Sequence, residues 1–219
     1  MPVLVYVLGT FMWEEFIETA RECQRMDYVW RFGTIPISVP ENVSTHSYWV
    51  ATYSAMIHQS MAPDDVVTLA ACVMKAIVHD TQEKESGDFV RTFKYRTKAL
   101  KREIDEAEKQ IVEEFGPSMK ALHVASESLT EKCGNGAYVN AVVKAADFMS
   151  LHNFMVREIM RGNREIVPFF KRMVSDLDEM IEKSLGATFT VGDSTFVPAV
   201  LYKDMMMNAI QVLKTSGFQ

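Results

Sequence analysis

The chain has 219 residues, of which 48% are hydrophobic and 24% charged, and its formal net charge is −6. At about 100–200 residues per domain, this length favours a single domain over residues 1–219, and the composition excludes a disordered or low-complexity protein. The negative charge argues against nucleic acid as a partner. No apolar run reaches the roughly 18 residues that a membrane-spanning helix needs, so no membrane partner is expected. Three widely spaced cysteines without a CxxC pair favour reduced thiols in the cytoplasm.

Helical periodicity dominates the chain. Successive helices are expected at residues 11–24, 44–57, 63–80, 95–115, 137–161, 165–185 and 198–214. The second is expected to begin at an N-cap formed by Ser44, and the third at Pro63 in its first turn. The dense charge of both signs in 95–115 is typical of a solvent-exposed helix. Two β-branched and aromatic runs around Gly192-Asp193 predict a small β-hairpin near 188–197. The expected fold is therefore an all-α helical bundle with one hairpin.

Three expected helices place a His or an Asp on an apolar face. Asp147 has Val143 and Leu151 as neighbours one turn away, and Asp80 and His46 also lie among apolar residues. A carboxylate buried without a partner costs several kcal/mol, so it normally finds a cation, a metal or a hydrogen-bond cluster. Each residue taken singly is more often an ordinary core residue. The set, however, is typical of a metal site in a helical bundle, and its ligand types suit Mn, Fe, Co, Ni or Zn.

The order of these residues resembles the H…HD…D pattern of the HD-domain metal-dependent phosphohydrolases. Flanking residues extend the resemblance to bacterial 5′-deoxynucleotidases and to small viral HD-domain triphosphohydrolases of dNTPs such as dATP. The matching blocks are Arg31-Phe32, ENVSTHS at 41–47, HDTQE at 79–83, Gly87-Asp88, Lys94-Tyr95 and KAAD at 144–147. They lie in the same order with near-identical spacing, inside a motif core of residues 28–160. Residues 1–25 and 165–219 match no motif.

The resemblance implies a role for each matched residue. It implies that one divalent transition metal (Co, Mn, Zn, Fe or Ni) is held by four residues, namely His46, His79, Asp80 and Asp147. Mg would accompany the substrate phosphates as a further ion. Glu83 would position or deprotonate the attacking water, and Asp88 would contact the sugar hydroxyl near the leaving oxygen. Arg31 and Lys94 would hold phosphate oxygens, and Phe32 would stack on the base or the sugar.

The chain departs from the bacterial pattern on the substrate side of the expected site. Residues 89–93 replace a Pro-x-Pro segment, and they include Arg91, a further cation close in sequence to Lys94. Phe32 stands where the bacterial enzymes have tryptophan. The metal set is intact, so these changes bear on the substrate more than on the chemistry.

Three functions remain open at this stage. The favoured one is a 5′-deoxynucleotidase that converts a dNMP to a deoxynucleoside and phosphate. The second is a triphosphohydrolase that releases triphosphate from a dNTP, for which Arg91 would help to hold the longer phosphate chain. The third is a non-catalytic helical scaffold, which the complete set of expected ligands disfavours. The charged segment 95–115 and the resemblance together predict a homodimer or larger homo-oligomer, in a bacterial or virus-infected cytoplasm.

Overall fold

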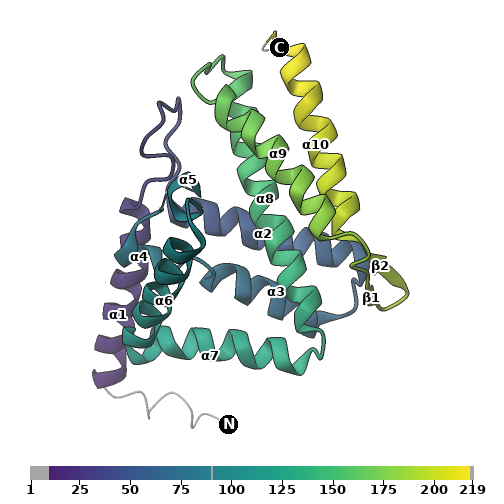
Figure 1. The fold of residues 1–219 in the computed structure, drawn as a ribbon. Helices are drawn as coiled ribbons and strands as arrows, with labels where there is room; N and C mark the ends of the chain where they lie inside the picture. The colour runs from purple at the N-terminus through teal and green to yellow at the C-terminus, as the bar shows by residue number, and fades with distance from the viewer. Residues whose placement is uncertain (1–9, 90, 218–219) are drawn as a thin grey trace.

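The computed structural model describes residues 10–89 and 91–217, although not the side chains of residues 10–12, 91 and 92. Helices and one hairpin follow one another along these residues (Figure 1). Their order is α1 (Thr10–Gln24), the 3-10 helix η1 (Arg25–Tyr28), α2 (Val43–Met61), α3 (Val66–Val78), α4 (Glu83–Ser86), α5 (Arg91–Lys94), α6 (Lys98–Glu114), α7 (Pro117–Lys132), α8 (Gly136–Met160), α9 (Val167–Lys183), β1 (Phe189–Val191), β2 (Ser194–Phe196) and α10 (Pro198–Thr215). The expected all-α fold with a small hairpin is confirmed.

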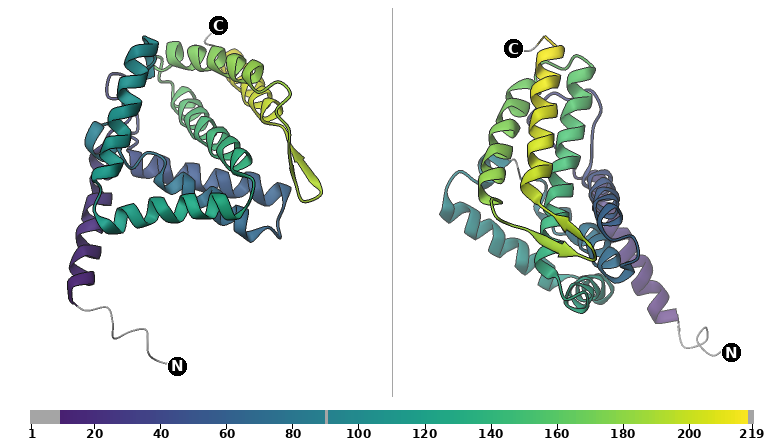
Figure 2. Two further views of the ribbon diagram at one scale, coloured as in Figure 1. Left: turned by 60° about the horizontal axis from the view of Figure 1, so that its bottom comes forward. Right: turned by 90° about the vertical axis from the view of Figure 1, so that its right-hand side faces the viewer.

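Helix α8 joins the two halves of the molecule. In Figure 1, α2, α3 and α7 run across the lower part, and α8, α9 and α10 rise above them. The views in Figure 2 agree with this arrangement, with α8 lying between α2 on one side and α9 and α10 on the other. Buried side chains of α8 such as Tyr138, Val142 and Phe154 belong to the main hydrophobic core. Packing on both sides therefore fixes the position of α8, and with it the residues that α8 presents toward α2.

Several helix starts differ from the sequence-based expectation by a few residues; α6 begins at Lys98 rather than 95 and α9 at Val167 rather than 165, and the caps of α2 and α3 explain two of the differences. Helix α2 begins at Val43, because the side chain of Asn42, rather than Ser44, accepts the capping hydrogen bond, from Thr45 N at 2.9 Å. Helix α3 begins at Val66, with Asp65 as the cap. Pro63 lies in the turn before α3 rather than in its first turn, because the chain reverses between the two helices over residues 62–65.

Helix α7 was not expected from the sequence, although its start carries a recognisable signal. Pro117 follows Gly116 and occupies the first turn, where its missing N–H and fixed φ are favourable. The buried side chains Met119 and Ser126 lie on the helix, which packs against α3.

The hairpin covers one end of the core, on the opposite side of the molecule from α1 (Figure 1). Strands β1 and β2 pair in antiparallel register, with Phe189 opposite Phe196. The turn requires a left-handed residue, and Gly192 supplies it with φ of +57°. Phe196 is buried and meets Tyr138 of α8 edge to face at a centroid distance of 5.6 Å. The predicted hairpin is thus confirmed and contributes to the core.

The composition predicted no membrane-spanning helix and no disulfide bonds, and the described residues bear on both features. Among the described residues, no helix combines the length and apolarity that crossing a membrane requires. The cysteines Cys23, Cys72 and Cys133 form no disulfide bonds in the structure.

Candidate active site

A cluster of His and Asp side chains lies where α2, α3 and α8 meet. His46 comes from α2, His79 caps the end of α3, and Asp147 comes from α8. Each of these three residues offers one ligand atom within 4.8 Å of the others. His46 Nε2 lies 3.3 Å from Asp147 Oδ1, and the His46 side chain is 2% exposed. The sequence-predicted residues therefore converge from three separate helices.

Asp80 stands at the edge of this cluster. Its Oδ2 atom lies 2.9 Å from His79 Nε2 and 3.6 Å from His46 Nε2. It does not belong to the group of three whose ligand atoms all lie mutually close. One carboxylate oxygen of Asp80 nevertheless faces both imidazoles, so a fourth ligand atom is at hand.

The two imidazoles are oriented as metal ligands are. His79 Nδ1 lies 2.6 Å from the carbonyl oxygen of Ala76, which can only accept, so Nδ1 carries the proton in this bond. The buried Nε2 atom faces Asp80 Oδ2 at 2.9 Å, and in the neutral imidazole it carries the lone pair that a metal ion would take. His46 is held from behind by Ser150 Oγ at 3.0 Å. Outer contacts of this kind fix the ring and the tautomer of ligating histidines, so the residues fit a divalent metal ion.

Electrostatics favour the ligand form of His46 and Asp147, whereas for His79 burial is outweighed by the Asp80 carboxylate, which raises the pKa. Burial, with the nearby Arg31 cation, lowers the pKa of His46 to about 4, so its imidazole is neutral at pH 7. Burial alone would raise the pKa of Asp147, but the Lys144 ammonium and His46 outweigh it and hold that pKa well below its usual value. Lys144 Nζ lies 2.8 Å from Asp147 Oδ2, which leaves Oδ1 directed at His46.

The pKa values of Glu83 and Asp88 are raised, in contrast to that of Asp147. Burial, followed by repulsion from Asp80 and Asp88, raises the pKa of Glu83 to about 10. Burial also raises the pKa of Asp88, and Arg31 offsets part of this effect. Both residues line the same cavity as Asp80 and Asp147. Neighbouring carboxyl groups whose pKa values are pushed apart are typical of acid–base sites.

The Arg31-Phe32 pair is fixed by its surroundings. Arg31 Nη1 donates to Glu41 Oε1 at 2.6 Å, and the two side chains are 12% and 4% exposed. The Phe32 ring stacks on Phe154 at a centroid distance of 4.5 Å, so one ring face is covered. Phe32 has φ of +60°, a left-handed conformation that costs an L-residue about 1–2 kcal/mol. Such strain persists where packing over-determines it, often at functional sites.

The loop after Phe32 is anchored by a buried carboxylate. Glu158 of α8 is 0% exposed and accepts hydrogen bonds from Ser38 N at 2.6 Å and from Asn163 Nδ2 at 2.7 Å. The loop carries Thr34 and Ile35 into the cavity wall. Sequence reasoning did not single out Glu158, because its partner backbone groups lie far away in the chain.

The cation Lys94 reaches the site from α5 and is already paired. Its Nζ atom lies 2.6 and 2.8 Å from the two carboxylate oxygens of Glu108 on α6. Arg91, the further cation expected from the sequence, belongs to α5, but its side chain lies outside the described part of the structure.

These residues surround a cavity of about 260 Å³. Its wall includes eight sequence-predicted residues, namely Arg31, Phe32, His46, Asp80, Glu83, Asp88, Lys94 and Asp147. The remainder of the wall is largely apolar, with side chains such as Phe148 and Met155. A cavity with an apolar wall and a polar, charged end suits a ligand that has both an apolar ring and a charged group.

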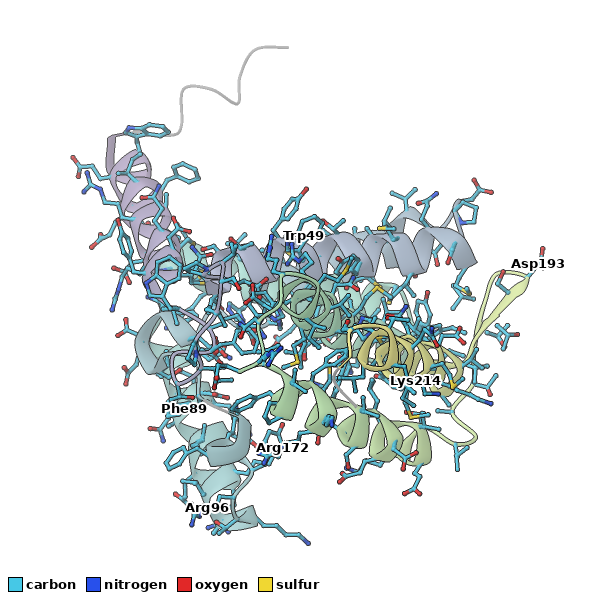
Figure 3. All side chains as sticks on the ribbon, turned by 90° about the horizontal axis from the view of Figure 1, so that it is seen from above. Trp49, Phe89, Arg96, Arg172, Asp193 and Lys214 are labelled. Carbon is cyan, nitrogen blue, oxygen red and sulfur yellow. The ribbon has the colours of Figure 1, made fainter. Side chains whose placement is uncertain are left out.

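Helix α9 supplies a wall that sequence reasoning missed. Its contributions are spaced three and four residues apart along one helix face, namely Phe169, Arg172, Met173 and Asp176. Figure 3 shows Arg172 at the edge of α9 that faces the segment of Phe89, which also lines the cavity. The periodicity predicted the helix, but only the tertiary structure shows that this face turns toward the site.

Comparisons with known proteins agree with this geometry. The model of the YfbR-like 5′-deoxynucleotidase family matches residues 18–199. A solved HD-domain phosphohydrolase from Listeria innocua (lin2634) superposes with a TM-score of 0.63 at 19% identity, covering 92% of this chain and 96% of that one. The HD phosphohydrolase DatZ of cyanophage S-2L, solved with dA and one catalytic Zn²⁺ ion, superposes with a TM-score of 0.54 at 18% identity, covering 91% and 96%. No curated protein matches the chain.

The family match extends beyond the motif core of residues 28–160 and takes in α9 and the hairpin. The two solved structures are too distant in sequence to show more than the fold, and each matches this chain over nearly its whole length. Sequence motifs, site geometry and family model therefore lead to one conclusion. The chain belongs to the YfbR-like 5′-deoxynucleotidase family and is a hydrolase with the HD-domain phosphohydrolase fold.

Proposed function

We propose that the protein is a metal-dependent 5′-deoxynucleotidase that hydrolyses a deoxynucleoside monophosphate to a deoxynucleoside and phosphate. The observation that carries the proposal is the convergence of His46, His79 and Asp147, two of which, His46 and Asp147, border the same cavity as Arg31 and Lys94. The apolar wall suits a nucleoside, and the polar end suits its phosphate. The family match supports the same substrate class.

In this proposal one divalent ion is held by His46, His79, Asp147 and Asp80. The donor set of two imidazoles and two carboxylates suits Co, Mn, Zn, Fe or Ni, and the Zn²⁺ of the cyanophage relative is one of these. When bound, the ion supplies Lewis acidity, which lowers the pKa of a water molecule and polarises the phosphoryl group. Mg²⁺ is proposed only as an ion that accompanies the substrate phosphate.

Glu83 is proposed to orient the attacking water and, in the metal-bound protein, where the charge of the ion favours the ionised carboxylate, to take the proton of that water. It begins α4, its backbone N–H donates to the carbonyl oxygen of Asp80 at 3.0 Å, and it borders the cavity. Asp88, also on the cavity wall, is placed to contact the sugar hydroxyl near the leaving oxygen. Arg31, held by Glu41, and Lys94, held by Glu108, bind phosphate oxygens. Phe32, whose ring stacks on Phe154 and has its centroid 5.2 Å from the Arg31 guanidinium carbon, is proposed to stack on the base or the sugar.

A second candidate activity is release of triphosphate from a deoxynucleoside triphosphate. The observation that favours it is Arg172, which borders the cavity and forms no ion pair among the described residues. A longer phosphate chain needs more positive charge than a monophosphate does. Arg91 was expected to serve this role, and its part in either reaction stays a prediction. A non-catalytic scaffold is disfavoured because three of the four expected ligands (His46, Asp80 and Asp147) and Glu83 border one cavity.

One screen separates these activities. Purified protein is incubated with each deoxynucleoside mono- and triphosphate in the presence of Co²⁺, Mn²⁺, Mg²⁺ or Zn²⁺, and phosphate and triphosphate are measured separately. We expect free phosphate from monophosphates. Triphosphate released from triphosphates would instead establish the second activity. If no substrate releases phosphate or triphosphate with any of the metals, the non-catalytic scaffold is the function that remains.

The proposal extends to the whole chain and its setting. We propose that residues 1–219 form one domain, because α9, outside the motif core, borders the same cavity as the motif residues. We also propose a cytoplasmic location, in line with the reduced cysteines, and a homodimer or larger homo-oligomer.

A further inference from the structure

Two carboxylates of helix α6 lie near Lys94 of the candidate site. Asp105 Oδ1 is 3.9 Å from Lys94 Nζ, and Glu108 is much closer. The side chains of Glu103 and Glu106 on the same helix are 67% and 61% exposed. The side chain of Glu108 is only 14% exposed, and its two oxygens lie 2.6 and 2.8 Å from Lys94 Nζ. The charged pattern of this segment predicted a solvated face, and Glu108 is the exception to it.

The pairing takes up most of the hydrogen-bonding capacity of Lys94. A lysine ammonium has three N–H donors and no acceptor. The two oxygens of Glu108 engage two donors, so one donor is left for the cavity, which Lys94 borders. The carboxylate also cancels part of the positive charge that an anion in the cavity would meet.

We propose that Glu108 is a positioning residue that sets the orientation of Lys94 and the charge it presents to the phosphate group. The inference rests on the proposed function, because it takes Lys94 as a phosphate-binding residue. Glu108 weakens the hold of the site on phosphate, so that the product leaves, while its two hydrogen bonds keep the third N–H of Lys94 directed at the substrate. The site then binds phosphate less tightly than its cations alone would.

Neighbouring cations support this interpretation of the pair. Arg31 is paired with Glu41, and Lys144 with Asp147. Each of these carboxylates lies deep in the fold or belongs to the metal cluster. Glu108 lies on a helix at the outside of the molecule (Figure 1), so its charge is changed without disturbing the core or the metal ligands.

The test measures binding of inorganic phosphate to the Zn²⁺-loaded protein by titration calorimetry. In Glu108→Gln the amide oxygen still accepts a hydrogen bond from Lys94, but the negative charge is gone. We expect the dissociation constant for phosphate to fall by about fivefold or more. Glu106→Gln is the matched control, since it makes the same charge change on the same helix at an exposed position, and it should shift the constant by less than about twofold.

A second pair of variants shows whether Glu108 acts through Lys94. In Lys94→Met, phosphate binding should weaken, and adding Glu108→Gln to that background should have no further effect. If Glu108→Gln behaves like Glu106→Gln, or tightens phosphate equally in the Lys94→Met background, the proposal is overturned. If Lys94→Met leaves phosphate binding unchanged, it is the assigned role of Lys94 in the proposed function that fails. Circular dichroism of each variant verifies the fold.

Discussion

Replacing Glu83 with Gln tests the proposed catalytic base most directly. Gln keeps the shape of the side chain and its hydrogen-bonding oxygen but cannot take a proton at neutral pH. If Glu83 is the base, turnover should fall by about two to four orders of magnitude, which corresponds to about 3–5 kcal/mol in the activation barrier. Metal content, measured by elemental analysis, should not change, because Glu83 is not among the expected ligands.

The structure also predicts how this variant changes stability with pH in the metal-free protein. The pKa of Glu83 is raised from 4.5 to about 10 by burial and by Asp80 and Asp88. A carboxyl group with a raised folded-state pKa contributes stability that is complete below its unfolded pKa and is lost as pH rises through its folded pKa. At 1.36 kcal/mol per unit, the wild type should lose up to about 4 kcal/mol between pH 6 and pH 9 that Glu83→Gln retains.

Urea unfolding of the chelator-treated proteins at both pH values measures this difference. A wild type that loses no more stability than Glu83→Gln would show that Glu83 is not the buried acid described above. Separately, a variant with a near-normal rate would move the base role elsewhere, with Asp88 as the next candidate. The two measurements are independent, so the chemistry and the electrostatics can fail separately.

Three further outcomes follow from the site and the sequence. Asp147→Ala should abolish metal binding and hydrolysis while circular dichroism shows the helices intact, and full activity with unchanged metal would refute the site. Arg172→Ala should raise KM for the nucleotide roughly five- to twentyfold with little change in kcat, whereas Lys171→Ala, the exposed neighbour that does not border the cavity, should leave both unchanged. Light scattering at micromolar concentration should give at least twice the mass of one chain, and the mass of a single chain would refute the expected oligomer.

The His–Asp cluster could be predicted from the sequence because its residues interrupt apolar helical faces. Asp147 lies between Val143 and Leu151 at helical spacing, and such a carboxylate needs a partner. Local patterns of this kind survive folding, since the helix that carries them forms much as its periodicity predicts. The exact helix starts were not predicted correctly. Asn42 and Asp65 cap α2 and α3, but several nearby polar residues could also have served as caps, and the turn geometry that selects one of them is not visible in the sequence.

The rest of the site depends on tertiary contacts that leave no local pattern. The pairing of Lys94 with Glu108 joins residues on different helices, outside the three- or four-residue spacing by which sequence patterns reveal ion pairs. The amphipathic face of α9 is visible in the sequence, but an apolar face can turn toward a core or a cavity, and periodicity does not distinguish the two. Helix identity is thus a local property, whereas the lining of a cavity is a property of the assembled fold.

The balance of charge around the cavity gives the proposed divalent cation a second role: it would supply the positive charge that attracts an anionic substrate. The chain as a whole is negative, at −6, and the carboxylates Asp80, Asp88 and Asp147 face the cavity. Two of the nearby cations, Arg31 and Lys94, are each held by a carboxylate of their own. An anionic phosphate entering such a cavity meets little net positive charge from the protein alone. Under the proposed function, the local reversal of sign that a phosphate substrate requires would come largely from the ion proposed at the His–Asp cluster.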